Sequence, residues 1–163
     1  MDEEKIEMPK LDGHHCFACG TENPKGLNLN FYRQGDFTCA DFTPDKLYEG
    51  WDNVVHGGIL STLLDEVMSW TIIYAKKTFM VTRSMTVKYI RPVEVGTPLI
   101  VKGRIIDDSK APKVTVMAEI RDMEDRLLTK GQGSFIMLSR EDMSSVPEKS
   151  KKEMIDVFDR IPG

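Results

Sequence analysis

The stretch VVHGGILSTLLDEVMSW, residues 54–70, constrains the fold more than any other part of the chain. Residues 58–75 form the only good candidate for a long helix, and apolar side chains occupy nearly all sides of it. Such a helix has to be covered on most of its surface by other parts of the chain. The sequence therefore predicts a central helix around which the rest of the protein is wrapped.

Segments with the residue alternation and β-branched content of strands lie on both sides of this helix. LNLNF (27–31) and FTCADFT (37–43) precede it, and four strand-like segments lie between residues 79 and 138. Pro92 ends the first of these four because proline cannot donate to a strand ladder. Two strands, one helix and four strands predict an α+β fold in which one antiparallel sheet wraps one long helix.

Composition excludes several functional classes. The net charge of −4 gives no basic surface for nucleic acid or for an acidic membrane, and no apolar segment reaches the roughly 18 residues that span a bilayer. The start MDEEKIEMPK is too charged for a signal peptide. Three cysteines without a secretory pattern favour reduced thiols, and so a cytoplasmic protein.

The 163 residues divide into three expected parts. We expect a polar, mobile N-terminal segment at 1–15, one domain at 16–140, and a C-terminal tail at 141–163. Residues 147–161 of the tail can form a short amphipathic helix, since several apolar side chains fall on one face.

The start of the central helix carries residues suited to polarising a carbonyl group. His56 precedes Gly57 and Gly58, where the first backbone N–H groups lack helical partners and carry the positive end of the helix dipole. Glycine lets a ligand oxygen approach these donors closely, and fixed donors stabilise an oxyanion without a metal. The structural alternatives are a tight turn for the glycines and a capping or loop role for His56.

Two adjacent carboxylates interrupt the apolar helix. Asp65 shares a face with Ser61 and Ser69 because the three recur every four residues, whereas Glu66 lies about 100° further round. A buried carboxylate needs a hydrogen bond or an opposite charge, and burial raises its pKa in a way that suits acid–base catalysis. The alternative is that the first face is simply the solvated stripe of an amphipathic helix.

HGGILSTLLDEVMSW (56–70) resembles the motif of hotdog-fold acyl-CoA thioesterases of the phenylacetic-acid-degradation type, which place a carboxylate nine residues after a His-Gly-Gly histidine. CFACGTENPKGLNLNF (16–31) and TRSMTVKYIRPVEVG (82–96) match in the same order. The resemblance runs from about Cys16 to Leu138. It implies the hotdog fold and hydrolysis of acyl-CoA to free acid and CoA, with no cofactor and no metal.

The resemblance also implies roles for particular residues. A glycine N–H at position 57 or 58 polarises the thioester carbonyl next to His56, and Asp65 acts as nucleophile or general base. Thr82 matches a strand Ser or Thr that helps to hold the water, although β propensity also accounts for a threonine there.

Asn53, Glu66 and Ser61 are the expected substrate-binding residues. Some relatives carry an asparagine six residues before the histidine; this chain has Gly50 there, and Asn53 is the nearest candidate. Glu66 leaves open which carboxylate works, and the resemblance favours Asp65. A hotdog hydratase places its aspartate before the histidine, which argues against that activity. A non-catalytic protein that binds or senses acyl-CoA is the alternative function.

The motif HHCFACG has two interpretations. Cys16 and Cys19, with His14 or His15, resemble the start of a zinc site, which normally needs four nitrogen or sulfur ligands. A second cysteine pair is missing, and only Cys39 remains. We therefore expect a reduced, metal-free structural turn near the active-site mouth.

Geometry predicts a homodimer. Asp65 lies seven or eight residues beyond the glycines, which is roughly 11–12 Å along a helix, whereas reacting atoms must approach to about 3–3.5 Å. Two antiparallel helices of a symmetric dimer overcome this, because each gives its N-terminus to one site and its Asp65 to the other. The resemblance implies the same edge-to-edge dimer, which can pair further into a homotetramer.

Overall fold

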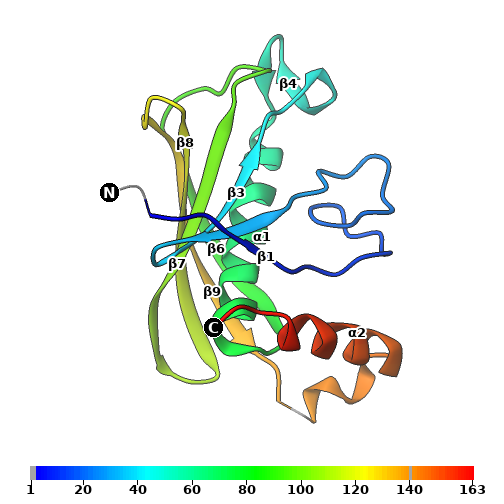
Figure 1. Ribbon diagram of the computed structural model, residues 1–163. Helices are drawn as coiled ribbons and strands as arrows, with labels where there is room; N and C mark the ends of the chain where they lie inside the picture. Colours follow the sequence, from blue (N-terminus) through cyan, green and yellow to red (C-terminus); the bar gives the residue numbers. More distant parts are fainter. Residues whose placement is uncertain (1–2, 140) are drawn as a thin grey trace.

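The computed structural model describes residues 3–139 and 141–163. One long helix, α1 (Gly57–Lys76), lies across an antiparallel sheet of seven strands, which confirms the expected α+β architecture (Figure 1). The sheet strands are β1 (Ile6–Met8), β2 (Phe31–Gln34), β3 (Phe37–Phe42), β6 (Met80–Tyr89), β7 (Leu99–Lys110), β8 (Lys113–Asp122) and β9 (Leu127–Met137). The remaining elements are β4 (Glu49–Trp51), β5 (Val54–Val55), α2 (Glu148–Asp159) and the 3-10 turns η1 (Lys46–Tyr48) and η2 (Asp142–Ser145).

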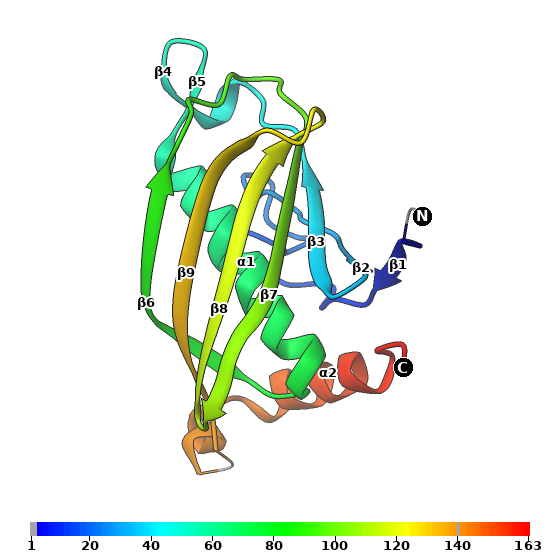
Figure 2. The ribbon, with the colours of Figure 1, turned by 90° about the vertical axis from the view of Figure 1, so that its left-hand side faces the viewer.

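The strand order in the sheet is β1-β2-β3-β7-β8-β9-β6. The strand that directly follows α1 therefore crosses to one edge and, among the described strands, pairs only with β9. Figure 2 shows β6 at this edge, with α1 behind the central strands. Because β6 is the last strand in this order, the other side of its ten-residue backbone is unpaired among the described strands. Most of its residues are also exposed.

A row of small residues allows α1 to approach the sheet. Gly103, Ala118 and Gly131 lie side by side on β7, β8 and β9. A Cβ atom on Gly103 would lie 3.1 Å from the side chains of both Val67 and Thr71 on the helix. Side chains larger than alanine along this row would push the helix away from the sheet.

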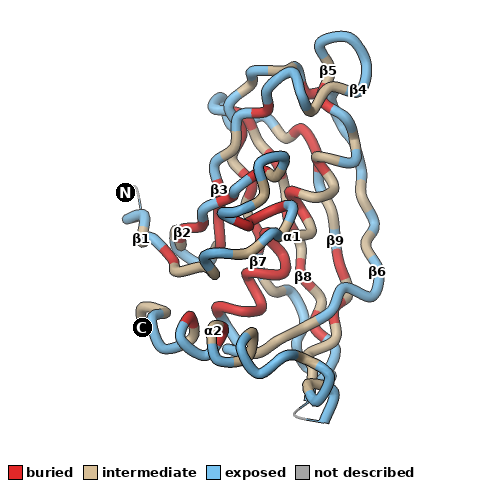
Figure 3. Tube along the Cα trace, turned by 90° about the vertical axis from the view of Figure 1, so that its right-hand side faces the viewer, coloured by how far each residue is buried: buried red, intermediate tan, exposed pale blue. Residues whose placement is uncertain are grey.

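The helix is covered on its other side by the chain from residue 9 to residue 31, most of which Figure 1 shows on the side of α1 away from the central strands. Phe31 stacks on Trp70 with ring centroids 5.2 Å apart, and the Tyr74 hydroxyl donates to the Pro9 carbonyl at 2.8 Å. The buried residues in Figure 3 accordingly follow α1 and the inner strands.

Residues 1–15, expected to be mobile, are in part fixed to the sheet. Strand β1 pairs with β2, with Glu7 opposite Tyr32, and Met8 is buried. The apolar residues of this short stretch were too few to indicate a strand. The C-terminal tail does contain the expected helix, α2, whose Met154 and Val157 are buried. Among the described residues, no helix is both long enough and apolar enough to cross a membrane.

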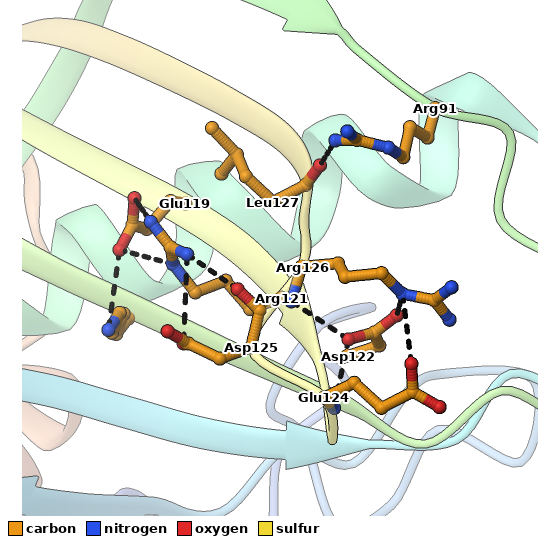
Figure 4. Close-up of polar contacts among 9 residues, drawn as sticks. Arg91, Glu119, Arg121, Asp122, Glu124, Asp125, Arg126 and Leu127 are labelled. Atoms are coloured by element: carbon orange, nitrogen blue, oxygen red, sulfur yellow. Dashed lines mark hydrogen bonds and ion pairs between the residues drawn. The ribbon is translucent and has the colours of Figure 1, made fainter.

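The turn between β8 and β9 is closed by a carboxylate (Figure 4). Asp122 accepts hydrogen bonds from the backbone N–H groups of Glu124 and Arg126 and from the Arg126 guanidinium, at 2.7–3.0 Å. Beside this turn, Arg91 donates to the Leu127 carbonyl at 2.6 Å. This contact holds the chain leaving β6 against the start of β9, and so helps to fix the end of the edge strand.

Replacing Ala118 with leucine should destabilise the fold. Ala118 is fully buried in the row of small residues, and overpacking such a position costs about 1–3 kcal/mol. Urea unfolding would measure the loss. Met117→Leu, on the outer face of the same strand, is the matched control and should change the midpoint much less; equal midpoints for both variants would contradict the role of the row.

Candidate active site

One face of α1 meets the edge strand β6 and gathers the polar residues of the candidate site. Gly57, Ser61 and Asp65 recur every four residues and lie on this face. The Thr82 hydroxyl on β6 donates to Asp65 Oδ1 at 2.9 Å. The structure therefore brings together two residues that the sequence assigned to catalysis, and Asp65 is a half-buried group with a defined partner.

Tyr89, at the end of β6, was not singled out from the sequence. Its hydroxyl lies 2.6 Å from Ser61 Oγ and also donates to the Gly57 carbonyl at 3.1 Å. The ring packs so close to Gly57 that a Cβ atom there would lie 3.3 Å from it. Tyr89 thus anchors the first turn of α1 to the edge strand.

A β-bulge explains how Thr82 and Tyr89 both face the helix. The two residues are seven positions apart, and in a regular strand an odd separation places side chains on opposite faces. The pairing of β6 with β9 shifts between Thr82 and Ser84, leaving Arg83 without a partner. The extra residue reverses the alternation, so Met85 and Val87, like Tyr89, lie on the helix side. The alternation of apolar and polar residues in the sequence does not reveal this change of register.

His56 caps the helix, as one of the sequence interpretations proposed. Its Nδ1 accepts the Gly58 backbone N–H at 2.8 Å. This contact occupies one of the two glycine donors, whereas the Gly57 N–H has no hydrogen-bond partner within residues 3–139 and 141–163. Gly57 is therefore the donor that remains for a ligand oxygen at the positive end of the helix.

Burial raises the pKa of Asp65 above its ordinary value. The hydrogen bond from Thr82 acts in the opposite direction, and the nearby Cys16 adds to the increase. An aspartate held in a half-buried site by one hydroxyl donor keeps its second oxygen for another partner. This environment suits a nucleophile or a general base.

Glu66 points to a different set of partners. Its Oε1 accepts from the Trp70 indole N–H at 2.9 Å and lies 4.0 Å from Cys16 Sγ. The pKa of Glu66 is raised to about 7, and burial is the largest of the causes. The two adjacent carboxylates thus lie in different surroundings: Asp65 faces β6, and Glu66 faces the cysteine turn.

Asn53 is not joined to these groups within one chain. It occupies the exposed turn between β4 and β5 with φ of +58°. Its backbone N–H donates to Glu49 Oε1, and its backbone carbonyl accepts from the Val95 N–H. Ser69, the third member of the expected solvated stripe, is buried. The stripe is therefore polar and partly covered rather than simply solvated.

The motif HHCFACG folds into a turn beside Glu66. One potential ligand atom from each of Cys16, Cys19 and Glu66 lies within 4.8 Å of the others. The proximity of the Cys19 thiol, together with the backbone at Cys19 and Ala18, outweighs burial and lowers the pKa of Cys16 to about 5. These contacts and burial raise the pKa of Cys19. This is the set of described residues that could hold a metal.

Similarity to known proteins covers the helix and strands that build the candidate site. The family model described as thioesterase superfamily matches residues 52–128, which contain α1 and β6–β8. A curated relative, verlamelin biosynthesis protein B from Lecanicillium sp, is 24% identical over 135 residues, covering 66% of this chain and 54% of that protein. The chain thus spans about half the length of this relative.

Solved structures share the fold. A thioesterase superfamily protein aligns with a TM-score of 0.70 at 24% identity, over 75% of this chain and 60% of that one. The Escherichia coli PaaI protein from the phenylacetic acid degradation operon has a TM-score of 0.63 at 16% identity, over 69% and 81%. A hypothetical thioesterase with coenzyme A from Streptococcus pneumoniae aligns with a TM-score of 0.63 at 17% identity, over 69% of this chain and 87% of that one.

At these identities the structural likeness shows the hotdog fold and leaves the expected phenylacetic-acid-degradation branch a prediction. The family match supplies a second and independent observation, because it covers the residues that build the face between α1 and β6. The chain is therefore similar to the thioesterase superfamily over residues 52–128 and shares the hotdog fold of the solved structures.

Proposed function

We propose that the protein hydrolyses acyl-CoA thioesters, with Asp65 as nucleophile or general base. The observation that carries this proposal is the hydrogen bond between Thr82 and Asp65 on the helix face that begins with the free Gly57 N–H. A hydroxyl that fixes one carboxylate oxygen leaves the other for the reaction. The coenzyme A in a structural neighbour that carries the thioesterase name supports this substrate class.

The Gly57 N–H holds the thioester carbonyl oxygen in this mechanism. The positive end of the helix dipole and a fixed donor stabilise the negative charge that develops there. Tyr89 holds the next peptide group through its hydrogen bond to the Gly57 carbonyl, and so helps to fix Gly57 itself. Asp65 either attacks the carbonyl carbon or takes a proton from a water molecule that does so.

One chain does not supply both groups to one substrate. Gly57 and Asp65 are eight residues apart on a single helix, or about 12 Å along its axis. We propose an obligate homodimer in which the exposed edges of two β6 strands pair. Each site then takes its N–H donor from one subunit and its Asp65 from the other. Two such dimers can associate into a homotetramer.

A protein that binds acyl-CoA without hydrolysing it is the alternative. The polarising N–H alone would serve binding, whereas a half-buried carboxylate with one oxygen free adds unfavourable charge next to a thioester. The Thr82–Asp65 pair therefore favours catalysis.

Asp65→Asn should reduce turnover of acyl-CoA by about 10²–10⁴-fold, because the amide neither attacks nor accepts a proton. Release of free CoA thiol measures the rate, and Asp36→Asn in the exposed turn after β2 is the matched control. Glu66→Gln distinguishes the two carboxylates. A larger loss in Glu66→Gln than in Asp65→Asn would show that the proposed residue is not the working one.

Thr82→Val should lower kcat by less than Asp65→Asn does, since it frees Asp65 without removing it. The expected loss is about tenfold, equivalent to one hydrogen bond to a charged group. Thr86→Val, on the outer face of the same strand, is the control for strand substitution. Equal kcat values for Thr82→Val and the unchanged protein would remove Thr82 from the mechanism.

Mixed subunits test the shared site. Asp65→Asn and Gly57→Pro, which removes the N–H donor, should each be inactive while keeping a folded circular dichroism spectrum. After subunit exchange, mixed dimers should regain one working site of two. Proven exchange without recovered activity, or a fully active monomer in analytical ultracentrifugation, would contradict the shared arrangement.

A further inference from the structure

The cysteine turn at 16–19 is built more rigidly than a surface loop requires. The Gly20 N–H donates to the Cys16 carbonyl at 2.9 Å, and the N–H groups of Leu27 and Leu29 donate to the Phe17 and Ala18 carbonyls. A Cβ atom at position 20 would lie 2.5 Å from the Cys16 nitrogen, so only glycine fits. The turn therefore presents both cysteine side chains in fixed positions.

A third group from a distant part of the chain completes the cluster. Glu66 comes from the middle of α1, 50 residues beyond Cys16, and its carboxylate and the two sulfur atoms lie within 4.8 Å of one another. The Trp70 indole N–H donates to Glu66 Oε1 and orients the carboxylate. Metal-binding carboxylates are held by neighbouring donors in this way.

The charges around the cluster suit a bound dication. Lys10 is anchored beside it, with Nζ donating to the Cys19 and Leu29 carbonyls at 3.1 Å and 2.7 Å. Two thiolates and one carboxylate carry three negative charges, which a dication and the ammonium of Lys10 together neutralise. Without an ion, two sulfur atoms and a carboxylate lie together in a partly buried site.

A histidine beside the turn has an unpaired nitrogen. His14 Nε2 is buried and has no hydrogen-bond partner among the described residues. Its Nδ1 accepts from the Cys16 backbone N–H at 3.4 Å, which places the ring next to the turn. Neither ring nitrogen of His14 belongs to the group of ligand atoms within 4.8 Å of one another, so His14 borders the turn and is not counted among the ligands.

We propose that Cys16, Cys19 and Glu66 bind a zinc ion, with a water molecule in the fourth position. Two thiolates select zinc over magnesium or calcium, and three protein ligands with one further donor match its tetrahedral coordination. This differs from the metal-free turn expected from the sequence. That expectation considered only cysteine and histidine as ligands, whereas the structure adds a carboxylate from the helix.

The proposed ion links the N-terminal segment to the central helix next to the candidate active site. Glu66 is adjacent to Asp65 in the chain, and Cys16 is close enough to affect the Asp65 charge. Zinc would thus fix the turn that covers α1 at the level of the catalytic carboxylate. Its role is to position this cover, and the Asp65 mechanism does not depend on it for a chemical step.

Metal content of the full chain tests the site without using hydrolysis as the readout. The protein is purified without added metal under reducing conditions. Elemental analysis by inductively coupled plasma mass spectrometry should then find about one zinc ion per chain. Replacement with cobalt should give the absorption bands of a tetrahedral thiolate complex. Cys16→Ser and Glu66→Gln should each lose most of the metal.

Cys39→Ser is the matched control, because Cys39 is a buried cysteine on β3 outside the cluster. It should retain zinc and the cobalt spectrum. Fully reduced, folded protein that binds no zinc after addition of a slight excess would overturn the proposal. Equal zinc in Cys16→Ser, Glu66→Gln and the unchanged chain would do so as well. Because binding is measured directly, failure here leaves the hydrolase proposal unaffected.

Discussion

The close approach of α1 to the sheet is the constraint on which the rest of the molecule depends. Gly103, Ala118 and Gly131 leave room for the helix over the three central strands. Since this is the only long helix of the described residues, its position determines where every functional group lies. The helix face turned to β6 carries Asp65, and the face turned to the N-terminal segment carries Glu66.

The position of β6 at the edge of the sheet determines two properties of the candidate site. An interior strand is paired on both sides, whereas β6 offers Thr82 and Tyr89 to the helix and still has a free backbone edge. The same strand therefore contacts the carboxylate that we propose to be catalytic, and its free edge is the surface at which we propose that a second subunit pairs. In this proposal, substrate binding and dimer formation depend on the same strand.

The elements with strong apolar periodicity were predictable from the sequence: α1 begins one residue before, and ends one residue after, the expected range 58–75. LNLNF was mistaken for a strand because Leu27 and Leu29 alternate as buried residues, although they lie in a coil that packs against the core. The site was predicted in part. Asp65 and Thr82 were both named from the sequence, and their hydrogen bond is seen only in the structure. The position of Tyr89 depends on a bulge, and the Glu66 cluster depends on a contact between segments 50 residues apart.

The bulge at Arg83 also limits how this strand can change during evolution. The segments before and after it are out of phase, so each presents its own alternate residues to the helix. A single-residue deletion that straightened the strand would restore one phase throughout and turn either Thr82 or Tyr89 outward. Length changes within the strand are therefore tolerated only in pairs or with the bulge retained. An alignment that conserves residue types but loses this phase would assign the wrong residues to the site.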